Sequence, residues 1–391
     1  MVLDRLAVKV VPYGRFPAGL APTQAHASRS TNGHTTDVAG SHLILTDTQS
    51  PTARRARLAS AARHLISRQR PLLSPCSSDP GENGMRTDKD IAVIGSSNMD
   101  LITYITRMPS EGETVEAPDF AMGFGGKGAN QAVSASRLGS RVLMLTRVGN
   151  DLFAQSTIEN YRRNGIDTTH VLSTEAASGV APIFVDEESR NSILIVKGAN
   201  ALLSPQDVRR AEDRIAACRL IVLQLEIPLE TVYEAVALGK RHSIPVLLNP
   251  APAQPDLELE KVCDCQYIVP NESELSLLTG MPVDSLDDVR NAAAVLLEVG
   301  IVNVIVTLGS RGALWMTRTE DRLIPGVAVE ARDTTGAGDA FIGCFSHFLV
   351  STGDTAASLE MANRYSADSV TKRGTQSSYA FKEEFEEILR G

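Results

Sequence analysis

Residues 333–345 read Asp-Thr-Thr-Gly-Ala-Gly-Asp-Ala-Phe-Ile-Gly-Cys-Phe, so a glycine-containing turn runs straight into an apolar segment. The pattern predicts a buried helix that begins at the glycines, because glycine supplies the backbone freedom that a sharp turn requires. The first N–H groups of a helix lack acceptors within it and lie at its positive end, so they favour an anion. Asp339 lies in this first turn. A lone Asp there would usually be a helix cap, but the preceding glycines favour a base beside an anion site.

Short apolar runs alternate with helix-like segments before this turn. Six runs rich in β-branched residues stand at 91–94, 142–145, 220–225, 246–248, 267–269 and 304–308. Such alternation is typical of βαβ units and predicts an α/β fold, with a mostly parallel sheet covered by helices on both faces. Ligands of such folds bind at the carboxyl ends of the strands, so the loops after the strands are candidate site segments.

Two regions, about 101–124 and 170–196, break this alternation. Within the second, residues 179–185 and 192–196 are typical of extended strands around a polar turn. The two regions predict a small β-sheet lid beside the main sheet.

Residues 1–88 mix Ser, Thr, Pro, Arg and His without sustained periodicity, and we expect most of them to be disordered. Residues 1–84 hold 10 Lys and Arg against 5 Asp and Glu, whereas the rest of the chain holds 28 against 42. The basic segment could be an organellar transit peptide, or an extension preceding a true start at Met85. We expect one folded domain over 89–391.

Composition argues against several classes of protein. An acidic folded domain lacks the basic surface that DNA or RNA binding requires. No apolar run approaches the roughly 18 residues that cross a bilayer, so no membrane segment is expected. The five cysteines include no C-x-x-C pair, which indicates neither a disulfide framework nor a zinc site. A reducing, cytoplasmic compartment is therefore expected.

Two glycine-containing loops near the start of the domain can face a ligand. Residues 95–100 read Gly-Ser-Ser-Asn-Met-Asp after the first strand, but no G-x-G-x-x-G follows, which makes nicotinamide binding a weak interpretation. Asn98 and Asp100 could instead bind hydroxyl groups, although alone they would usually form a turn. Residues 123–130 read Gly-Phe-Gly-Gly-Lys-Gly-Ala-Asn and open onto a helical pattern without a Walker motif. Such a loop is often purely structural, yet Lys127 and Asn130 can contact polar ligand atoms.

Two later loops suit a nucleotide. Residues 307–312, Thr-Leu-Gly-Ser-Arg-Gly, close a strand, and residues 270–274, Pro-Asn-Glu-Ser-Glu, begin a helix with an Asn cap and two carboxylates. Viewed alone, the second is ordinary capping. Mg²⁺ commonly takes one or two carboxylates beside phosphates, which gives these residues a second use.

In this order, the segments resemble the ribokinase branch of the PfkB-type carbohydrate kinase family across residues 90–391. The element at 125–130 and the element at 333–339 match the two signatures of that family. The resemblance implies a ribokinase-like three-layer sandwich with a β-sheet lid.

Carried over residue by residue, the resemblance implies three sets of contacts. The sugar would be held by Asn98, Asp100, Gly126, Lys127, Gly128, Ala129, Asn130, Glu226 and Asp339. The nucleotide would contact Asn271, Thr307, Leu308, Gly309, Ser310, Arg311, Gly312, Gly338 and Asn363. A monovalent cation, expected to be K⁺, would lie near Asp333, Thr335, Ser369, Lys372, Gly374 and Ser378. Glu274 would reach Mg²⁺ through water, and Asp333 could equally be a turn residue.

The implied reaction is ATP-dependent phosphorylation of D-ribose at its 5-hydroxyl. Asp339 would take the hydroxyl proton, while the amides of Gly336, Ala337 and Gly338 would neutralise the charge on the phosphoryl group. The family also implies a homodimer formed through paired lids.

Lys127 in this position resembles ribokinases, whereas fructokinase-like and adenosine-kinase-like members carry other residues. Deoxyribose, another pentose and a nucleoside stay open as substrates, because subtle changes in the pocket decide whether a substrate with one hydroxyl more or fewer is accepted. The rival of another class is a sugar-binding protein that kept the fold and lost catalysis. An intact Asp339 argues against it.

Overall fold

The computed structural model describes residues 90–188 and 190–390. The expectations of disorder and of a transit peptide over residues 1–88 lie outside these residues. Within the described ranges, no helix has the length and apolarity needed to cross a membrane.

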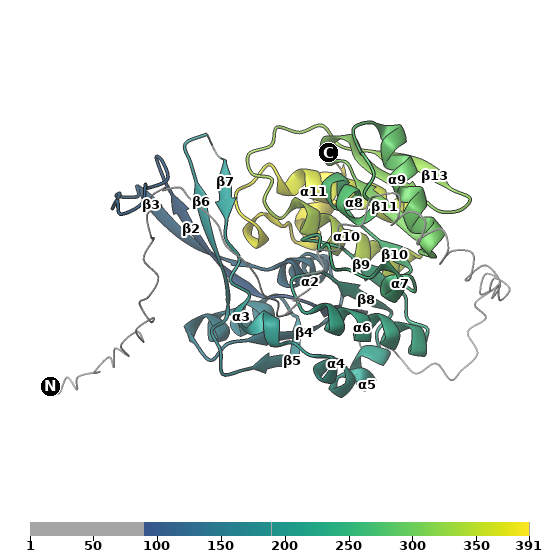
Figure 1. Ribbon diagram of the computed structural model, residues 1–391, viewed down its shortest axis with the longest axis horizontal. Coiled ribbons are helices and arrows are strands. Elements are labelled where there is room, and N and C mark those ends of the chain that lie inside the picture. The colour runs from purple at the N-terminus through teal and green to yellow at the C-terminus, as the bar shows by residue number, and fades with distance from the viewer. Residues whose placement is uncertain (1–89, 189, 391) are drawn as a thin grey trace, which may run out of the picture. The chain divides into compact units, whose positions relative to one another are not determined.

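Nine strands of the described chain form the larger sheet (Figure 1). In spatial order they are β13 (Asp321–Pro325), β12 (Gly312–Met316), β11 (Asn303–Thr307), β10 (Tyr267–Ile268), β9 (Val246–Leu248), β8 (Leu220–Leu223), β1 (Ile91–Ile94), β4 (Val142–Val148) and β5 (Asp167–Ser173). β12 pairs antiparallel with β11 and β13, and the other neighbours are parallel. The predicted mostly parallel sheet is confirmed with all six expected strands, and β5, β12 and β13 are additional.

Helices cover both faces of this sheet, as predicted. One face carries α4 (Pro205–Arg210), α5 (Glu212–Ala216), α6 (Leu229–His242), α7 (Leu259–Val262), α8 (Glu272–Thr279) and α9 (Leu286–Val299). The other carries α2 (Lys127–Arg137), α3 (Leu152–Arg163), α10 (Ala337–Thr352), α11 (Thr355–Ser369) and α12 (Lys382–Arg390). In β1, Ile91 and Val93 join one core while Ala92 and Ile94 join the other, because successive side chains of a strand point to opposite faces. Both faces are therefore apolar.

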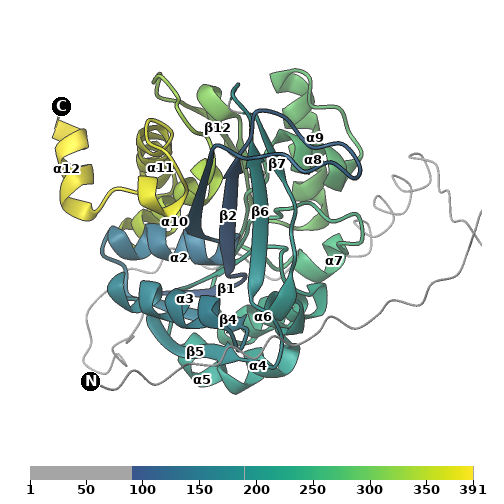
Figure 2. The same ribbon diagram turned by 90° about the vertical axis from the view of Figure 1, so that its left-hand side faces the viewer.

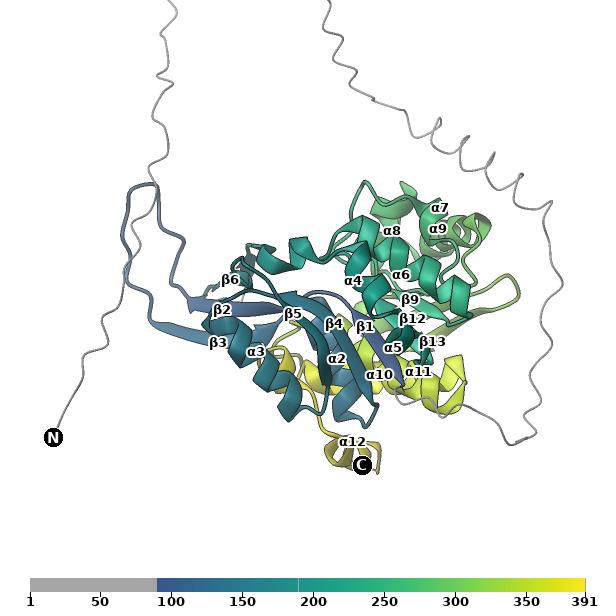
Figure 3. The same cartoon turned by 90° about the horizontal axis from the view of Figure 1, so that it is seen from below.

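A smaller sheet contains four strands of the described chain, in the order β3 (Asp119–Gly125), β2 (Asn98–Tyr104), β6 (Gly179–Val185) and β7 (Asn191–Ile193). Figure 2 shows β2 and β6 side by side, and they pair in parallel. In Figure 3, β2 and β3 project away from the larger sheet. The two predicted lid segments supply most of these strands. β2 begins at Asn98 and β3 ends at Gly125, both outside the first segment, so Asn98 and Asp100 lie in a strand rather than in a turn. In the second segment, residues 170–173 lie in β5 of the larger sheet, and β7 ends at Ile193.

The starts of α2 and α10 meet at the carboxyl edge of the larger sheet. These helices pack closely, since a Cβ on Gly343 would lie 2.4 Å from the Ser134 Cβ, and the Ser134 hydroxyl donates to the Ala340 carbonyl at 3.0 Å. Gly336 precedes α10 with a φ of 76°, in the left-handed region that glycine favours. A side chain there would also meet the Tyr379 hydroxyl at 2.7 Å. Glycine therefore sets where α10 begins.

Candidate active site

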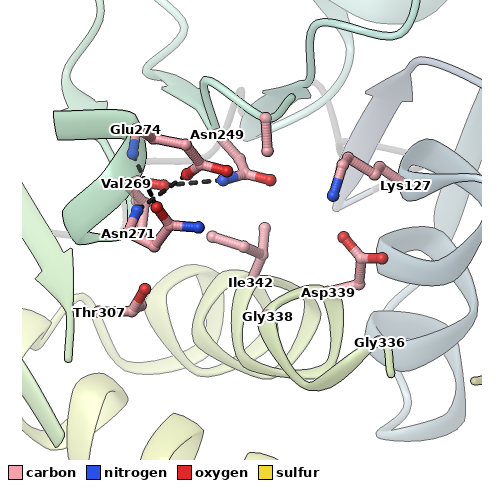
Figure 4. A pocket seen from close by; sticks show the side chains of 11 residues that line it. Lys127, Asn249, Val269, Asn271, Glu274, Thr307, Gly336, Gly338, Asp339 and Ile342 are labelled. Atoms are coloured by element: carbon pink, nitrogen blue, oxygen red, sulfur yellow. Dashed lines mark hydrogen bonds between the residues drawn. The ribbon is translucent and has the colours of Figure 1, made fainter. Parts of the chain in front are cut away.

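A cavity of about 200 Å³ opens where α2, α8 and α10 begin (Figure 4). It is lined by Lys127, Asn249, Ala251, Val269, Asn271, Glu274, Thr307, Gly336, Gly338, Asp339 and Ile342. In Figure 4, Lys127 and Asp339 stand on one side of this space, with Asn271 and Glu274 across from them. The fold thus brings the predicted base and lysine opposite Asn271 and Glu274 of the predicted helix start at 270–274.

Asp339 is buried in the first turn of α10 and accepts one hydrogen bond at each carboxylate oxygen. The Asn130 amide donates to Oδ2 at 2.9 Å, and the Gln131 amide donates to Oδ1 at 2.9 Å. Asn130, predicted as a sugar contact, therefore binds the predicted base. Gln131 was not predicted, because a Gln inside a helix carries no local signal of its partner.

Three carboxylates share this region with one lysine. Burial, together with the carboxylates of Glu226 and Asp339, raises the pKa of Asp100 from 3.8 to about 7, against a hydrogen bond from Thr375. Burial disfavours the Lys127 ammonium, but nearby carboxylates, that of Asp339 foremost, outweigh it and raise the lysine pKa. The lysine is therefore a cation beside Asp339, and Asp100 can change its charge near neutral pH.

Ser96 fixes the loop that leads into α2. Its hydroxyl donates to the Glu226 carboxylate, which also accepts from the Lys127 N–H at 3.0 Å. The N–H of Gly128 donates to the Ser96 hydroxyl at 3.3 Å, and that of Ala129 donates to the Ser96 carbonyl at 2.9 Å. Gly128 and Ala129, both predicted sugar contacts, thus use their N–H groups to hold the loop.

Asn98 is buried, and its side-chain carbonyl accepts from the Asn200 amide at 2.7 Å. Asn200 also pairs with the backbone of Ser97, accepting from its N–H at 2.9 Å and donating to its carbonyl at 3.1 Å. Because the Asn98 carbonyl is occupied, its N–H₂ group is the part available to a ligand. Asn200 was missed, since it stands about a hundred residues away in the sequence.

Two of the three predicted backbone donors at the start of α10 are free. Among the described residues, the N–H groups of Gly336 and Gly338 have no hydrogen-bond acceptor, as expected in a first helical turn. The N–H of Ala337, the third predicted donor, instead donates to the Thr334 carbonyl at 3.3 Å. Gly336 and Gly338 both line the cavity together with Asp339, so both glycines and the carboxylate border the same space.

A second cavity of about 330 Å³ continues from the first past Gly338. It is lined by Asn271, Glu272, Ser273, Thr307, Gly309, Gly312, Ala337, Gly338, Phe341, Asn363 and Ser366. Of the other predicted nucleotide contacts, Leu308 packs in the core, and Ser310 and Arg311 lie outside the lining. The Arg311 guanidinium pairs with Glu272 at 2.5 Å. The shared lining residues make the two cavities neighbouring parts of one site.

Asn271 and Glu274 form a reciprocal cap at the start of α8. The Asn271 side chain accepts from the Glu274 N–H, and the Glu274 carboxylate accepts from the Asn271 N–H, both at 2.8 Å. Burial raises the pKa of Glu274, although the Asn271 N–H and Lys127 oppose it. With Asp339, Glu274 makes two carboxylates in the cavity lining, which fits the one or two that Mg²⁺ takes from protein beside phosphates.

Asp333 joins two loops that were predicted to hold a monovalent cation. Its carboxylate accepts from the N–H groups of Thr335 at 2.9 Å and Gly374 at 2.8 Å, which lower its pKa although partial burial opposes the shift. Three of the predicted side chains donate hydrogen bonds to neighbouring residues: Ser369 to the Ser366 carbonyl, Lys372 to the Asp368 carboxylate and Ser378 to the Thr375 carbonyl. Backbone carbonyls, the Asp333 carboxylate and the hydroxyl oxygens, which keep their lone pairs while they donate, are the oxygens that these loops can offer. Within the described ranges, no three His, Cys, Asp or Glu residues cluster as metal ligands.

Known proteins resemble the chain in sequence and in fold. The model of a family described as pfkB family carbohydrate kinase matches residues 88–381. The chain belongs to the pfkB family of carbohydrate kinases. This pfkB kinase is 57% identical over 301 residues to a deoxyribokinase of Salmonella typhi, covering 77% of this chain and 98% of that relative. It is 39% identical over 299 residues to mouse ribokinase, and the match covers 75% of this chain and 93% of that relative.

Solved structures confirm the predicted ribokinase-like fold of this pfkB kinase. Ribokinase of Thermotoga maritima aligns with a TM-score of 0.71 at 35% identity, and the alignment covers 78% of this chain and 100% of that chain. Arabidopsis thaliana ribokinase, solved with ribose and ATP, aligns with a TM-score of 0.73 at 28% identity, covering 78% and 99%. The expected class of activity, a carbohydrate kinase, is confirmed by the family.

Proposed function

We propose that the protein transfers the γ-phosphoryl group of ATP to the 5-hydroxyl of D-ribose, with Asp339 as the base. The observation that carries the proposal is the joint placement of the Asp339 carboxylate, the Lys127 side chain and the free N–H of Gly338 around one cavity. A base, a cation and an anion-binding amide are the groups that phosphoryl transfer requires.

The sugar would lie over Asp339 and beneath the small sheet. Asp100 and Glu226 supply carboxylate acceptors for its hydroxyls, and Asn98 supplies an amide donor. When the 5-hydroxyl approaches Asp339, its proton passes to the carboxylate and its oxygen forms the bond to the γ-phosphorus as ADP leaves.

The phosphates would lie along the second cavity, next to Lys127 and the start of α10. The Gly336 and Gly338 N–H groups and the Lys127 ammonium would stabilise the negative charge on the transferring group. Asn271 and Glu274 would hold Mg²⁺ near them, directly or through water, and the ion would neutralise phosphate charge. A K⁺ ion between the loops joined by Asp333 would stabilise the conformation of the turn before Gly336.

The outer face of the small sheet suits a second copy of the chain. Phe120 is 55% exposed and Met122 is 62% exposed on β3, on the face opposite Ile102, which lines a cavity. An apolar sheet face of this kind favours a homodimer through paired small sheets.

2-Deoxy-D-ribose is the second candidate substrate. The relative at 57% identity is a deoxyribokinase, whereas the mouse ribokinase stands at 39%. The two sugars differ only in the 2-hydroxyl. A site that bonds this hydroxyl would penalise its absence by roughly 10⁴- to 10⁵-fold, whereas a site that does not would accept both sugars.

A coupled ADP-release assay tests the proposal across D-ribose, 2-deoxy-D-ribose, fructose and adenosine. The larger kcat/KM for D-ribose supports ribose, and the larger value for 2-deoxy-D-ribose assigns the second candidate. If no sugar is phosphorylated while ribose still binds by calorimetry, the protein is a sugar-binding relative without catalysis. Asp339→Asn should retain sugar binding and lose roughly 10²- to 10⁴-fold in kcat. The exposed Asp284→Asn serves as its matched control.

A further inference from the structure

Two chains of buried side-chain amides end on the Asp339 carboxylate. In the first, the Asn160 amide donates to Gln376 Oε1 at 2.8 Å, and the Gln376 amide donates to Asn130 Oδ1 at 3.0 Å. The Asn130 amide then donates to Asp339 Oδ2 at 2.9 Å. This chain links α3 and the short 3₁₀ helix at Gln376–Ser378 to the carboxylate.

The second chain approaches the other carboxylate oxygen. The Gln224 amide donates to Gln131 Oε1 at 2.6 Å, and the Gln131 amide donates to Asp339 Oδ1 at 2.9 Å. The same Gln131 nitrogen lies 3.2 Å from Asn249 Oδ1. All five donating amides of the two chains are buried, with Gln131 at 1% and Gln224 at 0% exposed.

The direction of donation is the same along both chains. The carbonyls of Gln376, Asn130 and Gln131 each accept from the amide before them, so their N–H₂ groups must face the next acceptor. The first carbonyl of the second chain, Gln224 Oε1, is buried and has no hydrogen-bond partner among the described residues. Turning over the amide of Gln376, Asn130 or Gln131 would bury an unpaired donor and acceptor, which costs about 1 to 3 kcal/mol for each group. The carboxylate plane is therefore fixed by residues that do not line its cavity.

We propose that Gln131 and Gln376 are positioning residues for Asp339. Gln131 acts directly on one carboxylate oxygen, and Gln376 acts on the other through Asn130. The inference rests on the role of Asp339 proposed above. Neither glutamine lines the cavities beside Asp339, so their effect should fall on turnover rather than on sugar binding.

Gln131→Met and Gln376→Met test the proposal, because Met keeps the length of the side chain and removes both the donor and the acceptor. We expect kcat to fall roughly 10- to 100-fold in Gln131→Met, the scale of a small misplacement of a reacting group. In Gln376→Met, where one residue intervenes, the fall should be smaller. The KM for the sugar should stay within about threefold in both, because the binding residues are intact.

Gln155→Met is the matched control, since Gln155 is exposed on α3 and its amide donates only to Glu159. The same substitutions in an Asp339→Asn background give the second readout. If the glutamines act through Asp339, they should lower the residual turnover of that variant by less than about twofold, because residues that act as a unit are non-additive.

The outcomes separate this inference from the proposed function. If Asp339→Asn keeps the parental rate, Asp339 is not the base and both proposals fall. If Asp339→Asn is impaired while Gln131→Met and Gln376→Met keep the parental kcat, only the positioning role is wrong. An equal loss of turnover in the Asp339→Asn background, or a rise in KM with kcat unchanged, also overturns it. If thermal unfolding shows that one Met variant is not folded, the kcat and KM of the other variant test the positioning role.

Discussion

Replacing Asp100 by Asn should raise the free energy of unfolding of the ligand-free protein at pH 8 and abolish its activity. Asp100 is 6% exposed, and burial with the neighbouring carboxylates of Glu226 and Asp339 raises its pKa from 3.8 to about 7. In the unfolded chain the carboxyl is ionised above its ordinary pKa, whereas in the folded chain it keeps its proton until about pH 7. Stability therefore falls as pH rises from about 4 to 7 and then stays level.

The magnitude follows from the two pKa values. One pKa unit corresponds to about 1.4 kcal/mol, so the full cost of ionising Asp100 in the fold is about 4 kcal/mol. Between pH 5.5 and 8, where the folded carboxyl loses its proton and the unfolded one is already ionised, the cost changes by about 2 kcal/mol. Asn cannot ionise, so Asp100→Asn should lack this loss. The variant should also fail to accept a sugar hydroxyl at that position.

Urea unfolding of the full chain without ligand, at pH 5.5 and at pH 8, measures the difference. The free energy of unfolding of Asp100→Asn relative to the parent should rise by about 2 kcal/mol between the two pH values. Asp119→Asn, an exposed change on the same small sheet, should show no such rise. A constant difference, within about 0.5 kcal/mol, would show that burial and the carboxylates of Glu226 and Asp339 do not raise the pKa of Asp100.

Four other perturbations follow from the structure. Asp339→Asn should lower kcat by roughly 10²- to 10⁴-fold with sugar binding retained, as measured by the coupled assay and calorimetry. Gly336→Ala combines a φ of 76° with a Cβ placed 2.7 Å from the Tyr379 hydroxyl, and urea unfolding should show a loss of about 1 to 3 kcal/mol. Asp333→Ala removes the hydrogen bonds that join two loops, so the activation of turnover by K⁺ should fall roughly 10-fold when turnover is measured at increasing KCl concentration. Phe120→Glu should convert a dimer to a monomer in sedimentation, and unchanged sedimentation would refute the small-sheet interface.

Much of the fold could be predicted from local pattern. Strands such as β1 and β8 are apolar on both faces because helices cover both sides of the sheet, and this gives uninterrupted runs of β-branched residues. β12 and β13 were missed, since an antiparallel pair at the edge leaves residues such as Asp321 and Arg322 exposed and breaks the run. Only residues 170–173 of β5 were placed in the lid, and the strand was not expected, because Asp167 and His170 make it more polar than its neighbours.

The sequence by itself determined where α2 and α10 begin, that Asp339 follows a glycine turn, and that Asn271 and Glu274 cap one helix. Each of these is a contact or conformation within a few residues, and short spacing leaves a pattern in the chain. Only the tertiary structure decided which groups hold Asp339. Gln376 and Asn130 stand 246 residues apart, and Asn200 and Asn98 stand 102 apart. A hydrogen bond across such separations depends on how the helices pack on the sheet, and it has no period or spacing that the sequence could display.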